Sequence, residues 1–183
     1  MDRRKFIKTT AAGIGGSVLM TACVYKVTPY QFFTQNEANC VIALTDQIIP
    51  ADDFGPGAAY ANVVNYIDRQ LVQVFIQDQS VYRQGIVSLQ KSCKELYAKL
   101  FENLDFETQT KFLEKIENDQ APKEYWTDNS SSGFFGMIIS HTMQGFYGSP
   151  RHGGNKNYIS YRLMNLEYPL VVGQNRYRGE NGS

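Results

Sequence analysis

The chain has 183 residues, and its 18 Lys and Arg residues balance its 18 Asp and Glu residues. This length fits one domain with an adequate hydrophobic core. Without residues 1–22 the chain keeps 14 basic and 17 acidic residues, a net charge of −3. Because no basic stripe with interleaved aromatic residues remains, we expect no nucleic-acid partner.

Residues 1–22 have the pattern of an export signal. Arg3 and Arg4 precede Lys-Phe-Ile-Lys, which looks like a twin-arginine signal, an address for cargo that folds before it crosses the membrane. The apolar run over residues 9–22 is shorter than the roughly 20 residues of a membrane-spanning helix, so an anchor helix is the weaker alternative. We therefore expect a periplasmic protein whose first 22 residues take no part in the fold.

Cys23 ends this segment and is a candidate for lipidation. Small residues precede it after an apolar run, as in a bacterial lipoprotein processing site, although Met20 stands where leucine is usual. A lipid on Cys23 would tether the domain to a membrane surface without spanning it. The alternative is cleavage near Ala22 without a lipid.

The remaining cysteines, Cys40 and Cys93, fall on the apolar faces of predicted helices. We interpret them as buried free thiols. A disulfide between them is the alternative, because an oxidising compartment permits one.

The body of the chain predicts α-helices joined by loops rich in Gly and Pro. Thr34 and Glu37 form a capping box that opens a first helix, and Pro50 ends it. A second predicted helix has an apolar face at helical spacing. Its members are Tyr60, Val63, Val64, Ile67, Leu71, Val74 and Phe75.

Three further helices are predicted. The third runs from about Asp78 and carries an apolar seam that includes Leu96 and Leu100, the fourth follows a cap at Asp105, and the fifth runs from about Ser132 to Tyr147. No segment alternates long enough to indicate a strand. We predict an all-α, single-domain bundle of about five helices over residues 34–172, after a linker at 23–33 and before a polar tail at 173–183.

The helical pattern breaks from Gly148 onward. Residues 148–155 contain three glycines and a proline, and residues 158–169 are rich in aromatics without a clean period. We expect an irregular C-terminal segment. One alternative is that it packs on its own bundle, and the other is that it lies against another protein. Both can hold for different residues of the segment.

Candidate catalytic residues are few. His141 falls on an apolar helix face, where a core histidine is the common case, and His152 lies in the glycine-rich loop, where contact with a partner or ligand is open. Asp52 and Asp53 could bind a cation or act as a base, but two acids before a Gly-Pro-Gly turn more often cap backbone amides. We therefore expect no catalytic site, no metal site and no cofactor in this chain.

Several ordered motifs resemble the gluconate 2-dehydrogenase subunit 3 family over roughly residues 30–170. One departure lies at residues 159–162, where family members often carry a Gly-Trp pair and where Tyr161 offers an aromatic ring instead. The matching motifs are Ile48-Ile49-Pro50-Ala51-Asp52-Asp53, Gly55-Pro56-Gly57-Ala58, residues 64–71, Gly145-Phe146-Tyr147-Gly148-Ser149-Pro150, Gly153-Gly154-Asn155-Lys156 and Tyr168-Pro169.

The resemblance implies a non-catalytic accessory subunit. Such a subunit binds a large FAD-dependent dehydrogenase of the glucose-methanol-choline type, which acts on a sugar, a sugar acid or a glycoside, and the pair is exported together by the twin-arginine route. FAD is then expected in the partner, and a cytochrome c subunit is a further candidate partner. One alternative is that Arg151, His152 or Asn155 contributes to a shared active site. Another is a free-standing periplasmic lipoprotein.

If the chain is such a subunit, two loops, residues 50–58 and 147–156, are expected to present the binding surface. Glycines there would allow close backbone approach, and tyrosines would supply buried area. The expected interface residues are Asp52, Asp53, Gly55, Pro56, Gly57, Tyr147, Gly148, Arg151, His152, Gly153, Gly154, Asn155, Tyr161 and Tyr168.

Overall fold

Residues 29–128 and 130–166 are described by a computed structural model of the protein. They form six α-helices, and their only β pairing is an isolated bridge between Asp52 and Gly55. The prediction of an all-α, single-domain bundle is confirmed. The predicted export signal, Cys23, Tyr168 and the polar tail lie outside the described residues.

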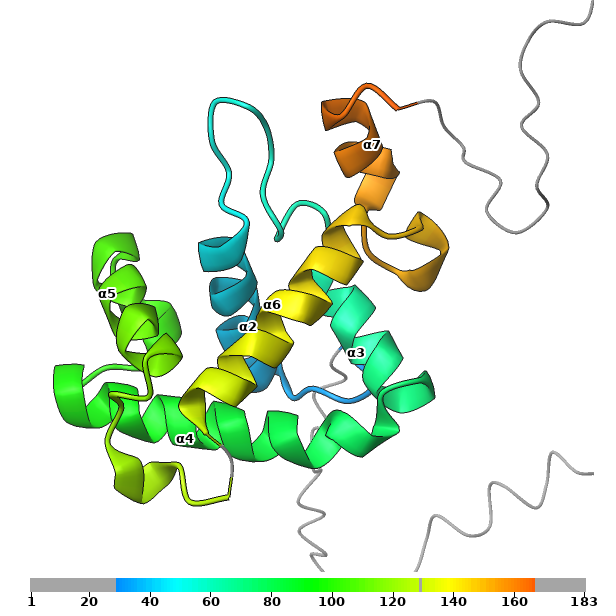
Figure 1. The fold of residues 1–183 in the computed structure, drawn as a ribbon. Helices are drawn as coiled ribbons and strands as arrows, with labels where there is room; N and C mark the ends of the chain where they lie inside the picture. Colours follow the sequence, from blue (N-terminus) through cyan, green and yellow to red (C-terminus); the bar gives the residue numbers. More distant parts are fainter. Residues whose placement is uncertain (1–28, 129, 167–183) are drawn as a thin grey trace, which may run out of the picture.

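Six α-helices and five short 3-10 helices follow one another along the chain, labelled as in Figure 1. None of these helices has both the length and the apolar composition needed to cross a membrane. In chain order the elements are α2 (Gln35–Ile48), α3 (Val63–Gln73), η1 (Ile76–Asp78), α4 (Gln79–Tyr97), η2 (Phe101–Asn103), α5 (Phe106–Glu117), η3 (Lys123–Tyr125), α6 (Ser131–Tyr147), η4 (Pro150–His152), η5 (Lys156–Tyr158) and α7 (Ile159–Leu163).

Side-chain caps fix the starts of three helices. At α2 the Thr34 hydroxyl accepts from the backbone N–H of Glu37, and the Glu37 carboxylate accepts from the backbone N–H of Thr34, so the predicted capping box is confirmed. Asp105 caps α5 and Ser130 caps α6 in the same way. Each cap satisfies a backbone donor that the first turn of a helix leaves unpaired.

The second predicted helix is shorter than its apolar pattern indicates. α3 begins at Val63, after Asn62 adopts a left-handed conformation (φ 60°), and ends at Gln73. Tyr60 and Val74 therefore lie outside the helix, and their side chains are 47% and 61% exposed. Similarly, α4 ends at Tyr97, so Leu100 does not continue its seam.

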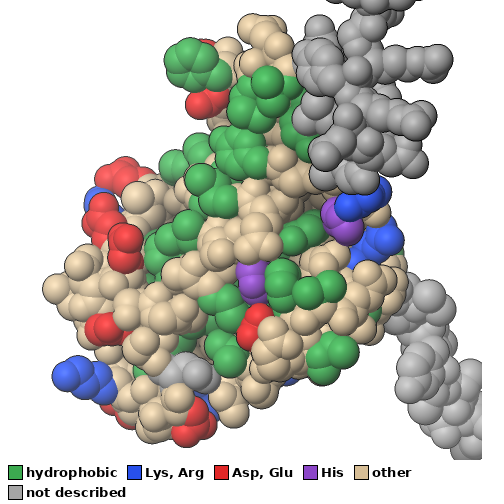
Figure 2. Space-filling view, turned by 45° about the vertical axis from the view of Figure 1, so that its right-hand side comes forward, with side chains coloured by type: hydrophobic (Ala, Val, Ile, Leu, Met, Phe, Trp, Pro, Cys, Tyr) green, Lys and Arg blue, Asp and Glu red, His purple; other side chains and the backbone are tan. Residues whose placement is uncertain are grey.

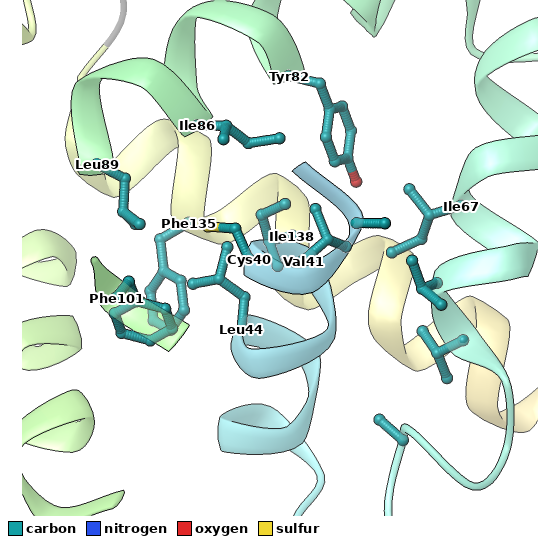
Figure 3. Packing of buried hydrophobic residues seen from close by; sticks show 14 of the residues in the cluster. Cys40, Val41, Leu44, Ile67, Tyr82, Ile86, Leu89, Phe101, Phe135 and Ile138 are labelled. Atoms are coloured by element: carbon teal, nitrogen blue, oxygen red, sulfur yellow. The ribbon is translucent and has the colours of Figure 1, made fainter. Parts of the chain in front are cut away.

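The hydrophobic core forms where α6 crosses the other helices. Figure 1 shows α6 running across the front of the bundle, and α6 contacts α2, α3, α4, α5 and α7. Figure 3 shows side chains of α2, α3, α4 and α6 converging around α2. Fully buried members of this core include Val41, Leu44, Ile67, Tyr82, Leu89 and Ile138.

Both predicted thiols lie in this core. Cys40 and Cys93 are free and buried, so the interpretation as core cysteines is confirmed. Burial raises the pKa of the Cys93 thiol to about 12. Because the thiolate is the reactive form of cysteine, this thiol is chemically inert at neutral pH.

Part of the predicted linker belongs to the fold, which corrects its boundary. The carboxylate of Asp68 on α3 is buried and accepts hydrogen bonds from the backbone N–H groups of Gln31, Phe32 and Phe33 at 2.7–2.9 Å. The Phe33 side chain is 2% exposed. A buried carboxylate needs such donors, and here they come from the segment that precedes α2.

The C-terminal segment is also more regular than predicted, because residues 159–163 form α7. The helix has five residues, about one and a half turns. Such a short helix cannot display a 3.6-residue period, which explains why the sequence pattern did not reveal it.

The close packing of Gly85 on α4 against α6 allows a prediction about stability. A Cβ atom on Gly85 would lie 2.2 Å from Cδ2 of Phe134, whereas a Cβ on Gly136 of α6 would meet nothing within 4 Å. We expect Gly85→Ala to lower the free energy of unfolding by about 1–3 kcal/mol through overpacking. Gly136→Ala, the matched control, should raise it by about 0.5–1 kcal/mol. Urea unfolding followed by circular dichroism measures both changes. An unchanged free energy of unfolding in Gly85→Ala would contradict the close contact between Gly85 and Phe134.

Candidate functional site

The two predicted loops lie at the same end of α6. The chain entering α3 is joined to the second loop by a hydrogen bond from the backbone N–H of Lys156 to the carbonyl of Ala61 at 3.1 Å. The first loop reaches α7, since a Cβ on Gly55 would lie 2.5 Å from Cδ2 of Leu163. Figure 1 shows the first loop, the segment after α6 and α7 at this end of the molecule. The structure therefore brings together residues that are about a hundred positions apart in the sequence.

The first loop is a closed turn. The Asp52 carboxylate accepts from the backbone N–H groups of Phe54 and Gly55 at 2.9 and 3.1 Å, as expected for an acid that caps a turn. The turn presents Phe54, whose side chain is 89% exposed, with Asp53 exposed beside it. Among the described residues, no group of three or more His, Cys, Asp or Glu side chains is arranged to hold a metal ion.

The second loop is held to α6 by Asn155, whose side chain is fully buried. Its Nδ2 donates to the carbonyl of Gly148 at 2.8 Å, and its Oδ1 accepts from the backbone N–H of Ser160 at 3.0 Å. Gly154 packs so closely that a Cβ there would lie 2.2 Å from the Gly145 carbonyl oxygen. The close backbone approach at Gly154 is thus made within the chain.

The predicted interface residues of this loop divide by exposure. Gly154, Asn155 and Tyr161 are buried within the domain, so these residues pack on their own bundle. Tyr147 is 43% exposed and Arg151 is exposed. These two side chains are accessible to a partner; that they contact one stays a prediction.

Arg151 also meets its neighbour in the chain. Its Nε donates to Nε2 of His152 at 2.9 Å. His152 is half-buried, so the two side chains form one small unit at the edge of the loop.

The outward face of α6, which no sequence motif marks, adjoins these loops. We define this face by the exposed residues Gly136, Ser140, Met143, Gln144 and Tyr147, together with Ile139, which is partly buried against the core. All seventeen residues of α6 lack Asp, Glu, Lys and Arg, so neither side of the helix is charged.

The solvent side of a surface helix usually carries charged and polar residues, whereas the outward face of α6 has Ser140 and Gln144 as its polar side chains and no charged one. In the isolated domain only one side of α6 is covered, and Met143 is 45% exposed. Figure 2 shows hydrophobic side chains spread from the top toward the centre of this face of the molecule, with a histidine and basic side chains at its right-hand edge. The run of seventeen residues without a charge was the available signal in the sequence.

His141 lies on the opposite, buried side of α6. Its ring stacks on Phe75 with centroids 4.3 Å apart, and its Nδ1 lies 2.9 Å from the hydroxyl of Tyr82. Its Nε2 lies 3.9 Å from a carboxylate oxygen of Asp78. Burial lowers the pKa of His141 more than the nearby Asp78 raises it. The structure therefore confirms the interpretation of His141 as a core histidine.

A shallow pocket lies between α4 and η3, formed by other elements than the two loops. Neither histidine lines it. Its lining includes Gly85, Ser88, Lys91, Tyr125, Trp126 and Asp128.

The chain was compared with known proteins. A family model described as gluconate 2-dehydrogenase subunit 3 matches residues 35–167, which include all six described α-helices. No curated protein and no solved structure matches the chain.

The two hydrogen bonds of the Asn155 side chain generate a testable prediction. Asn155 and Asn157 both adopt left-handed conformations (φ 44° and 57°), but only Asn155 is buried and bonded through its side chain in the ways described. We expect Asn155→Ala to lower the free energy of unfolding by about 2–3 kcal/mol, because the buried N–H of Ser160 and the partly buried carbonyl of Gly148 both lose their partner. Asn157→Ala should lower it by about 1 kcal/mol, the effect of the backbone conformation alone. Equal losses in a thermal or urea unfolding experiment would show that the side-chain bonds contribute nothing.

The buried His141 makes stability depend on pH. Its pKa in the folded protein is below the ordinary value of 6.5, so the unfolded chain binds the proton more readily. The contribution of neutral His141 is complete above about pH 6.5 and is lost as the pH falls below it. We expect unfolding free energies measured between about pH 8 and pH 5 to decrease toward acid. His141→Gln should flatten this slope, and His152→Gln, the matched control, should keep it.

Proposed function

The chain belongs to the gluconate 2-dehydrogenase subunit 3 family, and on that premise we propose that it is the non-catalytic small subunit of an FAD-dependent dehydrogenase. The larger subunit, of the glucose-methanol-choline type, holds FAD and oxidises a sugar, a sugar acid or a glycoside. The task of this chain is to bind that subunit.

The exposed, uncharged outward face of α6 is the observation that carries this proposal. The cores of protein interfaces are depleted of charged residues and enriched in aromatic residues and methionine. The outward face of α6 has this composition, with Met143 and Tyr147 as its large exposed side chains. Phe54, Leu163 and Met164 add exposed apolar surface at the end of α6 where the loops meet. Contiguous exposed apolar surface of this kind marks an interaction site.

The architecture supports assigning FAD to the partner. Dinucleotides are usually bound where a glycine-rich turn joins a β-strand to a helix. Across residues 29–128 and 130–166 the only β pairing is the isolated bridge between Asp52 and Gly55. The described part of this chain therefore offers no such turn.

The N-terminal pattern supports joint export. A twin-arginine signal at Arg3 and Arg4 suits a subunit that binds its folded, FAD-loaded partner in the cytoplasm and crosses the membrane with it. The complex is then periplasmic, and a lipid on Cys23 would hold it at a membrane surface. A cytochrome c subunit is the proposed electron acceptor.

Affinity purification of the tagged full-length chain from its native cells tests this proposal. We expect a large subunit in the eluate, together with the visible absorbance of flavin. Met143→Glu places a charge in the centre of the outward face of α6 and should reduce the co-purified flavin about tenfold or more, as at an interface hot spot. Val87→Glu, which puts the same charge on a half-exposed apolar position of α4, is the control and should retain the flavin.

The outcomes separate the parts of the proposal. A wild-type eluate without flavin contradicts the function itself. Flavin that is retained equally by Met143→Glu contradicts the assignment of the interface to α6. Intact assembly of His152→Ala with an altered kcat or KM would instead favour the shared active site.

A further inference from the structure

Charge is unevenly distributed along this chain. Residues 130–166, which form α6, the second loop and α7, contain Arg151, Lys156 and Arg162 but no Asp or Glu. Residues 29–128 contain 8 basic and 15 acidic residues. The part of the fold that carries the outward face of α6 is therefore net positive, and the remainder is net negative.

Basic side chains gather where the second loop meets α3. The Gly153 position borders the side chain of Arg69, since a Cβ there would lie 2.9 Å from Arg69 Cδ. Arg151 and His152 immediately precede Gly153, and Lys156 extends over the ring of Tyr60 at 5.7 Å. We call the charged side chains of Arg69, Arg151 and Lys156 the basic rim; the His152 imidazole, which accepts the hydrogen bond from Arg151, lies beside it. Figure 2 shows a histidine with Lys or Arg side chains beside the hydrophobic surface.

The basic rim is not neutralised by ion pairs within the described part of the chain. There, Lys and Arg form ion pairs in Arg83–Glu37 and Lys111–Glu107, and both pairs lie outside the rim. The charges of the rim therefore remain available to an outside partner.

The second loop, which carries Arg151 and Lys156 of the rim, is held in one conformation. Gly153 (φ 103°), Asn155 and Tyr158 adopt left-handed conformations, which persist for non-glycine residues only when the surroundings hold them. Asn65 Nδ2 donates to the Gly153 carbonyl at 3.0 Å, and Asn155 ties the loop to α6. A rigid loop loses little conformational entropy when its side chains bind.

We propose that the surface of the flavin-bearing subunit that contacts this chain has an apolar centre, which covers the outward face of α6, and an acidic edge, which faces the basic rim. This inference rests on the proposed function and adds the chemistry and orientation of the docked partner. Asp52 and Asp53, on the first loop, carry the opposite charge and would repel the acidic edge of the partner. The partner is therefore expected to dock in the orientation that places its acidic edge at the basic rim.

A protein fits this surface better than an anionic membrane does. Segments that bind anionic lipids usually cluster four to eight Lys and Arg residues, more than the rim contains. Here Asp53 is exposed beside Phe54, on the loop that contacts α7, and would be repelled by anionic headgroups.

Association kinetics test the proposal. The full-length chain, as wild type and as the double variant Arg151→Glu/Lys156→Glu, is bound to the immobilised flavoprotein subunit that co-purifies with it. At about 20 mM salt we expect the double variant to associate about tenfold more slowly, and at about 300 mM salt the difference should shrink, because salt screens steering. Lys115→Glu on α5, an exposed lysine outside the rim, should associate like wild type.

Each outcome bears on a separate claim. If the flavoprotein does not bind the wild-type chain, the proposed function fails. If it binds and the double variant behaves like Lys115→Glu, or associates faster, the acidic edge is wrong. Binding of the wild type to phosphatidylglycerol vesicles that the double variant loses, with flavoprotein binding unchanged, would reassign the rim to a membrane. The milder Arg151→Gln/Lys156→Gln variant, with its helicity checked by circular dichroism, should show a smaller slowing of the same sign.

Discussion

The burial of one side of the uncharged helix α6 is the constraint on which the rest of this structure depends. α6 contacts five of the other elements, and its aromatic side chains Phe134 and Phe146 are almost fully buried. Hydrophobic burial of this kind is the main favourable term in folding. The crossing with α4 is close only because Gly85 leaves room for Phe134.

The same helix links the fold to the proposed function. Its C-terminal end holds the second loop through Gly145 and Asn155, and its outward face reaches solvent without a charge. Side chains that a partner would contact therefore project from a rigid helix and from loops fixed to it. Such a surface binds without much reordering, which suits a subunit whose task is association.

The sequence predicted the site in part. It singled out the two loops that the fold brings to one end of α6, and it allowed for both packing and partner contact. It did not separate Gly154, Asn155 and Tyr161, which are buried, from Arg151 and Tyr147, which are exposed. That division depends on contacts between residues far apart in the chain, such as Asn65 with Gly153. The outward face of α6 was overlooked because a helical period shows which residues share a face, not whether a second face is covered.

The sequence by itself determined the all-α class, the capped starts of α2 and α5, and the resemblance that the family match confirms. These follow from local chemistry, because a cap and a 3.6-residue period act within a few positions. Only the tertiary structure decided that residues 31–33 pack on Asp68, that α3 begins at Val63 and that α7 forms. Each of these depends on the contact of a buried polar group or an apolar face with a segment that is distant in the sequence. A local sequence pattern does not show which distant segment makes that contact.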